Sequence, residues 1–273
     1  RGPVSVTVEC LVGWQHTRAS LQFTLYADLP YLDIQTRLYM QARQKMIKLV
    51  FPFALPGARA ICEVPYGAAE RPADATEYPC GRWLRLETPD MTVGLANSGQ
   101  SAFDVSADGV LGLSLSRGAI YACWEPGRID PARSYTFMDQ EPIDTRFRLL
   151  AGRDRGIVAA SLIPAALELH QPLEHFFVYH PPTPPEGAPA DPAPFIQAEP
   201  ATVAVSALKK AACADALIVR LAETVGQPTA ARITLEGTHS YAATFRPFEV
   251  KTLRLRREDG DVIWEPTNLL EEG

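Results

Sequence analysis

Arg117 is the residue whose type and position most clearly suggest ligand binding. It ends the alternating segment LGLSLSRG and is followed by a glycine. A strand that ends on Arg-Gly presents a planar guanidinium, with several N–H donors, at the end of a sheet, where loops gather and ligand sites are common. An ion pair between domains is the alternative interpretation of this arginine.

The histidines do not form a convincing metal site. His175 and His180 are the closest pair, but their spacing matches neither the (i, i+4) spacing of a helix nor one face of a strand. No third ligand stands near them. The sequence therefore predicts no metal site in this chain, and one of these imidazoles is expected to pack against Phe176 or Phe177.

The cysteines indicate neither disulfides nor a zinc site. They are five in number, widely spaced and without a C-x-x-C pair. Reduced and mostly buried thiols are the expectation. The five positions are Cys10, Cys62, Cys80, Cys123 and Cys213.

The elements that must position these groups are strands. Between Leu32 and Met40, apolar residues alternate with polar ones, a period of two that buries one face of a strand. Short strands in series, with almost no helical pattern between them, predict antiparallel sheets packed face to face. Strands are predicted over residues 4–10, 20–27, 31–40, 46–53, 59–64, 82–87, 92–97, 109–116 and 145–150.

A proline-rich segment divides the chain. Residues 181–200 favour an extended linker or a long surface loop, because proline removes backbone donors and favours polyproline conformations. The predicted domains are therefore a large β domain over residues 1–180, this linker, and a smaller β-sandwich over residues 201–273.

An ordered set of segments resembles the C-terminal β region of glycoside hydrolase family 38, the α-mannosidases. The resemblance implies an all-β fold, with a galactose-mutarotase-like antiparallel supersandwich followed by a smaller C-terminal sandwich. The segments are TLYADLPYLDIQTRLYM, KMIKLVFPFAL, ICEVPYGAAERP, GRWLRLE, VGLANSGQSAFDV, LGLSLSRG, FMDQ, ALIVRLAE and RPFEVKTLRL.

The resemblance also implies where the chemistry lies. Enzymes of this family hydrolyse α-mannosides with retention, using an aspartate nucleophile, a second carboxylic acid and a zinc ion in an N-terminal catalytic domain. The zinc site there opens with a His-x-Asp pair, and none of the five histidines here is followed by Asp at plus two. No catalytic residue is therefore expected in this chain, and zinc is expected in the missing domain.

The same resemblance places the end of the Arg117 strand and the following loop towards the catalytic domain. The candidates for a substrate-side rim or a domain interface are Arg117, Tyr121, Trp124, Asp139 and Gln140. The segment DQEPIDTRFRLLAG departs from the family pattern, in which Gly follows Asp-Gln, and this allows a divergent specificity. Glu63, in EVPYG, is better explained as a residue that stabilises a turn.

Charge and hydropathy narrow the choice of partners. A net charge of −6 and a pI near 5.5 argue against a nucleic-acid surface. No apolar run is long enough to span a membrane, so a soluble, cytoplasmic protein is expected. The chain starts at Arg1 without an initiator Met, which suggests a fragment of a longer polypeptide.

The predicted function is that of a non-catalytic domain. It would brace the catalytic domain of the same polypeptide and contribute to the rim of a site for α-mannoside oligosaccharides; a homo-oligomer is left open. One alternative is an independent carbohydrate-binding module with an aromatic platform near Trp124. Another is a mutarotase-like sugar epimerase, which needs an inward-pointing histidine on a strand, and none of the five lies in a convincing one.

Overall fold

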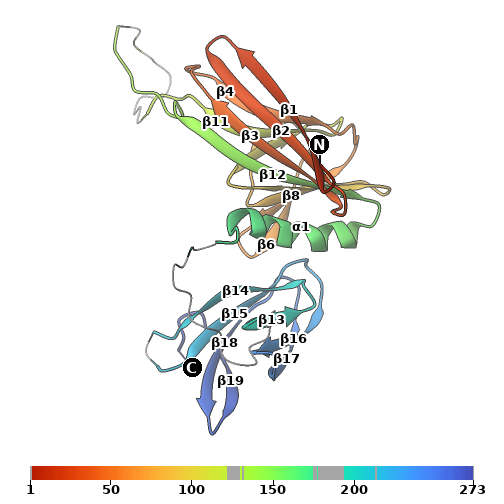
Figure 1. Ribbon diagram of the computed structural model, residues 1–273, viewed down its shortest axis with the longest axis vertical. Coiled ribbons are helices and arrows are strands. Elements are labelled where there is room, and N and C mark those ends of the chain that lie inside the picture. Colours follow the sequence, from red (N-terminus) through yellow and green to blue (C-terminus); the bar gives the residue numbers. More distant parts are fainter. Residues whose placement is uncertain are drawn as a thin grey trace. The chain divides into compact units, whose positions relative to one another are not determined.

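A computed structural model of the chain describes residues 2–121, 130, 132–174, 177, 194–212 and 214–272. The chain divides into two compact units (Figure 1). The first unit comprises Arg1–Val64 and Ala69–Pro172, and the second comprises Pro65–Ala68 and Leu173–Gly273. Of the predicted linker, residues 181–193 lie outside the described residues, and Ile196–Glu199 form a strand.

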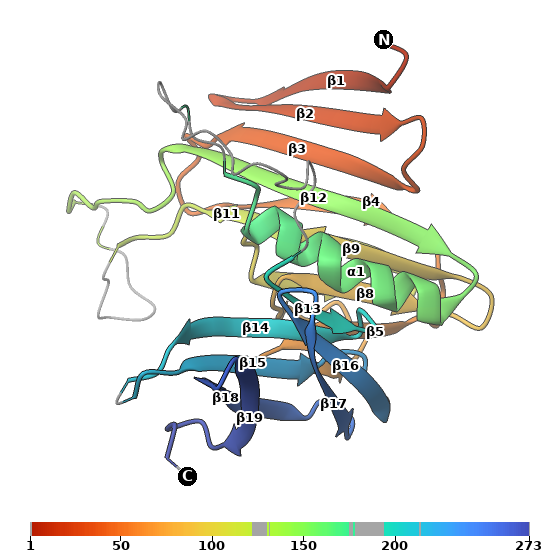
Figure 2. The same ribbon diagram turned by 60° about the horizontal axis from the view of Figure 1, so that its bottom comes forward.

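The first unit is built on two antiparallel sheets. The larger has eight strands, and Figure 2 shows β1 and β2 at one end of it. Its strands, in spatial order, are β1 (Ser5–Trp14), β2 (Thr17–Tyr26), β3 (Tyr31–Tyr39), β12 (Pro142–Gly152), β9 (Thr92–Asn97), β8 (Trp83–Glu87), β5 (Arg59–Val64) and β6 (Gly67–Arg71). The smaller sheet contains β4 (Met46–Pro52), β11 (Val110–Arg117), β10 (Ala102–Val105) and β7 (Tyr78–Pro79).

The two sheets enclose one apolar core. Alternate residues of β3, such as Ile34 and Leu38, are buried, while Gln35 and Arg37 are exposed, as the period of two predicts. Ile34 packs in one cluster with Phe147 of β12 in the large sheet and with Phe103, Leu111 and Leu113 of the small sheet. The core therefore lies between the sheets, as in a sandwich.

One helix covers the large sheet and was not predicted. Helix α1 (Arg155–His170) packs on β8, β9 and β12. A β-carbon on Gly94 would lie 3.1 Å from the methyl groups of Leu162, so the glycine allows the helix to approach β9 closely. Its segment is apolar almost throughout and contains Pro164, so no amphipathic helical stripe marks it in the sequence.

The second unit is a smaller sandwich. Its core contains Val219, Leu221, Ile233, Leu253 and Leu255, all nearly inaccessible to solvent. One sheet has three strands, β13 (Ile196–Glu199), β16 (Thr229–Leu235) and β17 (His239–Phe245). The other has four, β14 (Val203–Lys210), β15 (Leu217–Glu223), β18 (Val250–Glu258) and β19 (Asp261–Thr267). The predicted fold class, a large antiparallel β-sandwich followed by a smaller one, is confirmed.

Candidate functional site

The long loop between β11 and β12 brings most of the predicted site residues together. Its two arms pair: the backbone N–H of Tyr121 donates to the Thr136 carbonyl at 2.9 Å, and that of Met138 to the Ala119 carbonyl at 2.8 Å. Near the base of these arms lie four of the candidates, Arg117, Tyr121, Asp139 and Gln140. The fifth, Trp124, lies outside the described residues.

Asp139 fixes the end of strand β11. Its Oδ2 accepts a hydrogen bond from the backbone N–H of Arg117 at 2.9 Å and lies 3.4 Å from the hydroxyl of Ser116. Asp139 itself has a positive φ of 53°, a conformation that aspartate tolerates better than most residues. Its carboxylate is therefore a structural acceptor that holds the loop against the strand.

Arg117, by contrast, has a guanidinium without a side-chain hydrogen bond or ion pair in the described part of the chain, although its positive charge helps to lower the pKa of Glu77. The Arg117 side chain is exposed, and the hydrogen bond to Asp139 is made by the backbone N–H of Arg117 rather than by the guanidinium. An unpaired guanidinium offers five N–H donors to a ligand or to another domain. Gln140 is used locally, because its Nε2 donates to the Met138 carbonyl at 3.0 Å, and Tyr121 is 67% exposed.

A polar cavity of about 380 Å³ opens beside Arg117 and Asp139. Its walls combine three serine hydroxyls, two carboxylates, one amide and one guanidinium, a set that matches the hydroxyl groups of a saccharide better than an apolar ligand. The cavity is lined by Met46, Glu77, Gly99, Gln100, Ser101, Ala102, Ser114, Leu115, Ser116, Arg117 and Asp139.

Gln100 is one of the cavity residues that sequence reasoning missed, as it missed Glu77 and the serines. Its side chain is only 9% exposed, and its buried Oε1 has no hydrogen-bond partner in the described structure. A buried acceptor without a partner costs about 1–3 kcal/mol. A ligand hydroxyl that donated to it would recover this energy once the Gln100 side chain turns its amide into the cavity. The turn Asn97-Ser98-Gly99, where Asn97 Oδ1 accepts from the N–H of Gly99 at 2.9 Å, leads the chain to Gln100.

Lys48 organises the charges next to the cavity. Its ammonium contacts the carboxylate of Asp104 and lies 3.2 Å from that of Glu77. Burial alone would lower the pKa of Lys48, but hydrogen bonds to Asp104 and Glu77 outweigh it and raise the pKa. The hydroxyl of Ser114, together with Lys48, holds the pKa of Glu77 below its ordinary value despite partial burial.

The electrostatics of the cavity do not favour Glu77 as the acid of a glycosidase. A glycosidase needs a carboxylic acid with a raised pKa that can protonate the leaving group. Glu77 has a lowered pKa, which is the opposite of what a proton donor needs. Asp139 is engaged in holding the end of β11 through the backbone N–H of Arg117.

The described residues do not fit a zinc ion. Within the described ranges no three His, Cys, Asp or Glu side chains cluster as metal ligands. His175 and His180, the closest pair in the sequence, lie outside those ranges. His170, which is described, lies with Nε2 at 2.9 Å from the Asn97 carbonyl. No step of the chemistry is assigned to a metal here.

Other predicted residues have structural roles. Glu63 accepts hydrogen bonds from the backbone N–H and the guanidinium of Arg82, so it joins the end of β5 to the start of β8 and has a structural role. Cys62 is buried, Cys80 is partly buried and Cys10 is exposed, all as free thiols. Cys123 and Cys213 lie outside the described residues.

Strands β1 and β2 carry an apolar face that no element of the described part of the chain covers. Val8 pairs with Phe23 and Val12 with Ala19, and both β2 residues pack against the core. Side chains of directly paired residues point to the same face, so the β1 side chains extend the core-facing surface of the sheet. This surface, called the β1 face below, consists of Val6, Val8, Cys10, Val12 and Trp14.

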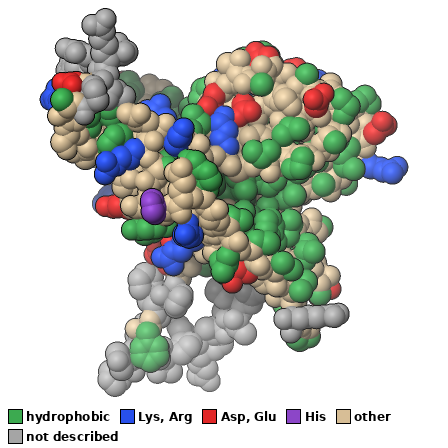
Figure 3. Space-filling model, turned by 90° about the horizontal axis from the view of Figure 1, so that it is seen from above, with side chains coloured by type: hydrophobic (Ala, Val, Ile, Leu, Met, Phe, Trp, Pro, Cys, Tyr) green, Lys and Arg blue, Asp and Glu red, His purple; other side chains and the backbone are tan. Residues whose placement is uncertain are grey.

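The β1 face is exposed along its length. Val8 is 58% exposed, and Val12 and Trp14 are each about half exposed. Figure 3 shows hydrophobic side chains gathered over the middle of one face of the molecule. A contiguous exposed apolar patch of this kind usually marks an interaction surface.

Comparisons with known proteins relate part of the chain to a known domain family. Residues 1–130 match the family model described as glycosyl hydrolases family 38 C-terminal domain. No curated protein sequence matches the chain. Within the described residues, no helix has the length and apolar character needed to cross a membrane.

Two solved structures share the fold. An alpha-mannosidase from Enterococcus faecalis V583 is 16% identical, with a TM-score of 0.71, over 87% of this chain and 29% of that one. A protein in glycosyl hydrolase family 38 from Enterococcus faecalis is 17% identical, also with a TM-score of 0.71, over 87% of this chain and 30% of that one. The chain thus spans about 30% of the length of these relatives. The resemblance predicted from its segments is confirmed by the family model over residues 1–130.

Proposed function

We propose that this chain is the non-catalytic C-terminal β region of a retaining, zinc-dependent α-mannosidase. It braces an N-terminal catalytic domain of the same polypeptide, which holds the zinc ion, the nucleophile and the acid. The observation that carries this proposal is the match of residues 1–130 to the family 38 C-terminal domain, combined with a shared fold that spans only 29% of an α-mannosidase chain.

The bracing role is assigned to the β1 face. Its side chains continue the inner surface of a sandwich but remain in solvent. Burying the exposed part of each valine would contribute on the order of 1 kcal/mol. The four largest side chains together can therefore stabilise a domain interface by several kcal/mol, before the cost of association is subtracted.

The rim role is assigned to the cavity beside Arg117. The guanidinium of Arg117 and the unpaired Oε1 of Gln100 offer a donor and an acceptor to the hydroxyl groups of an α-mannoside.

The reduced thiols of Cys10, Cys62 and Cys80 support a cytoplasmic location, where thiols are kept reduced.

The test compares this chain with the same chain extended upstream to its full reading frame. Both are assayed for hydrolysis of a chromogenic α-mannoside with added zinc. Activity is expected only in the extended protein. Activity of the isolated 273-residue chain would overturn the proposal and require a catalyst among its own carboxylates.

The rim role has its own test in the extended protein. Arg117→Met is expected to raise KM about tenfold, which corresponds to about 1.4 kcal/mol of lost substrate binding. Arg153→Met, at an exposed arginine beyond the other end of β12, is the matched control and should leave KM unchanged. An unchanged KM in Arg117→Met would restrict this arginine to a domain contact.

A further inference from the structure

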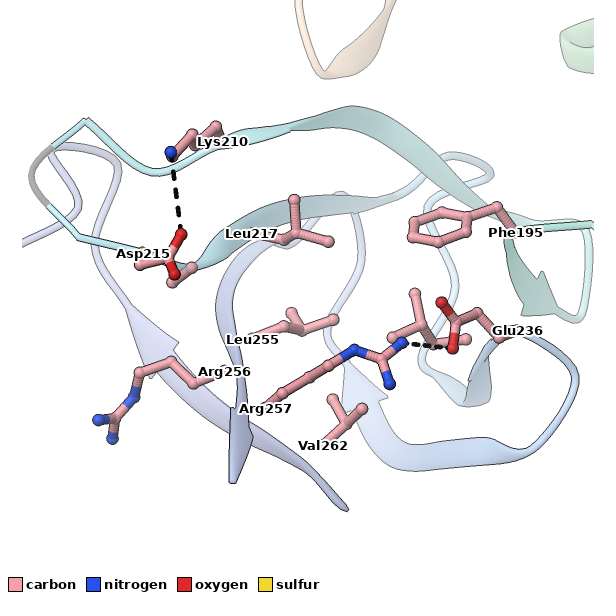
Figure 4. A pocket seen from close by; sticks show the side chains of 11 residues that line it. Phe195, Lys210, Asp215, Leu217, Glu236, Leu255, Arg256, Arg257 and Val262 are labelled. Carbon is pink, nitrogen blue, oxygen red and sulfur yellow. Dashed lines mark hydrogen bonds and ion pairs between the residues drawn. The ribbon is translucent and has the colours of Figure 1, made fainter. Parts of the chain in front are cut away.

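A second cavity lies within the second unit, at one end of its sandwich (Figure 4). Its volume is about 400 Å³, at the small end of the range of roughly 300–1,000 Å³ that is usual for ligand pockets. It lies where strands of both sheets end, beside Phe195, the loop residue that precedes β13. Its lining includes Phe195, Lys210, Asp215, Leu217, Glu236, Leu255, Arg257 and Val262.

The floor of this cavity is apolar and rigid. Leu255, which is 3% exposed, belongs to the core of the sandwich, and Leu217 and Val262 pack against that core. These side chains come from three neighbouring strands, β15, β18 and β19. The floor is therefore the end of the hydrophobic core, left open to a ligand.

Phe195 forms an aromatic wall at the mouth. Its side chain is 47% exposed, and Figure 4 shows its ring on one side of the cavity, near Glu236. The carbonyl of Phe195 accepts a hydrogen bond from the N–H of Glu236 at 2.8 Å, and the next residue, Ile196, pairs with Leu235 in the sheet. The ring is thus attached to the end of a strand rather than to a free loop.

Each charged side chain at the rim is paired with one of opposite charge. The Nη2 of Arg257 lies 2.5 Å from Oε2 of Glu236, and the Nζ of Lys210 lies 3.8 Å from Oδ1 of Asp215. Arg256 pairs with Glu265 at 2.5 Å. A charged ligand would have to compete with these pairs, whereas hydroxyl groups can accept from the cations and donate to the carboxylates.

We infer that this cavity binds a neutral pyranose, as a mono- or disaccharide. The C–H face of the sugar ring would lie on Phe195 and the leucine floor, and its hydroxyl edge would meet the Arg257–Glu236 pair. An apolar wall combined with a few fixed polar groups is the usual composition of a small-molecule site. The inference depends only on the second unit and stands apart from the function proposed for the first.

The test titrates the isotope-labelled 273-residue chain with D-mannose and with an α-linked mannobiose, followed by NMR. Saturable shifts are expected at the backbone amides around Phe195, Glu236 and Arg257, with a Kd on the order of 1–10 mM, or about 3–4 kcal/mol. D-Glucuronate, a charged pyranose, should bind at least fivefold more weakly than the neutral sugars.

Variants locate the site. Phe195→Ala is expected to weaken binding about tenfold, because it removes the aromatic wall. Ile263→Ala is the matched control, since Ile263 is also partly exposed but alternates with Val262 and points away from the cavity. Thermal unfolding of each variant checks that the sandwich is intact.

Three results would overturn the inference. They are the absence of saturation up to about 100 mM sugar, equal binding by the wild type and Phe195→Ala, and saturable shifts confined to the cavity around Gln100. The last result would place saccharide binding in the first unit and support the rim role proposed there.

Discussion

Gln100 illustrates how a single buried atom can indicate a binding site. Its Oε1 is enclosed by protein and lacks a partner in the described structure, although most buried polar atoms in folded proteins are hydrogen-bonded. The serine hydroxyls and the guanidinium of the same cavity would be unremarkable alone. Together they make a site whose donors and acceptors a sugar could satisfy.

Replacing Gln100 by methionine separates stability from binding. Gln100→Met removes the unpaired acceptor at similar size, so the free energy of unfolding of this chain should stay the same or rise by about 1 kcal/mol. In the extended enzyme, KM for the α-mannoside should rise while kcat stays unchanged. Urea unfolding and steady-state kinetics measure the two effects.

Gln41→Met is the control for this prediction. The Nε2 of Gln41 donates to the carbonyls of Met40 and Gln140, so its replacement should destabilise the chain slightly. A loss of stability in Gln100→Met as large as that in Gln41→Met would show that the Gln100 amide makes hydrogen bonds of its own.

At the scale of elements, β1 is the strand that carries more apolar side chains than packing within this chain buries. Its apolar residues alternate as in a buried strand, yet all its residues after the first are exposed. An edge strand with an apolar face is an association hazard unless something covers it. This is the physical reason for assigning the β1 face to the domain interface.

A lysine on either side of β1 tests that assignment. Val8→Lys places a charge on the β1 face and should abolish docking of a separately expressed catalytic domain, measured by analytical ultracentrifugation. Leu11→Lys, on the opposite face of the same strand and 79% exposed, should leave docking intact. Equal effects of the two variants would exclude the β1 face as the interface.

The contact between α1 and β9 provides a second prediction at this scale. Gly94→Ala should destabilise the first unit by about 1–3 kcal/mol, because its new methyl group would lie 3.1 Å from Leu162. In Leu162→Ala the space is vacated, so adding Gly94→Ala should cost less than it does in the wild type. A double-mutant cycle by thermal unfolding measures this coupling, and strictly additive effects would contradict the contact.

For the molecule as a whole, the ionic cluster of Lys48, Glu77 and Asp104 predicts a dependence of stability on pH. The pKa of Glu77 is lowered from 4.5, so its contribution is complete above that value and is lost as pH falls through the folded pKa. The pKa of Lys48 is raised from 10.5, so its contribution is complete below that value and is lost as pH rises further.

Lys48→Met tests this dependence. It should lower the unfolding free energy by about 1–2 kcal/mol near pH 7, because Glu77 and Asp104 lose their shared cation. The loss should shrink as the pH falls below about 4.5 and Glu77 is protonated. Thermal unfolding as a function of pH, with Lys210→Met at an exposed pair as control, checks the prediction; a constant difference between Lys48→Met and the wild type would contradict it.

The sequence by itself determined the class of the protein. Alternation in segments such as Leu32–Met40 records which face of each strand is apolar, and that is sufficient to predict two antiparallel sandwiches. Ordered short segments identified the family resemblance, and Arg117 was recognisable because it ends a strand next to a glycine. These features are local, so they can be read one segment at a time.

Only the tertiary structure decided which surfaces are covered. The alternation of β1 resembles that of a buried strand, but its exposure in the described structure depends on where distant segments lie. The burial of Gln100 depends on strands far away in the sequence, and α1 lacks a polar stripe to mark it. A sequence pattern indicates which side chains form one face of a strand, whereas the packing of separate elements determines what lies against that face.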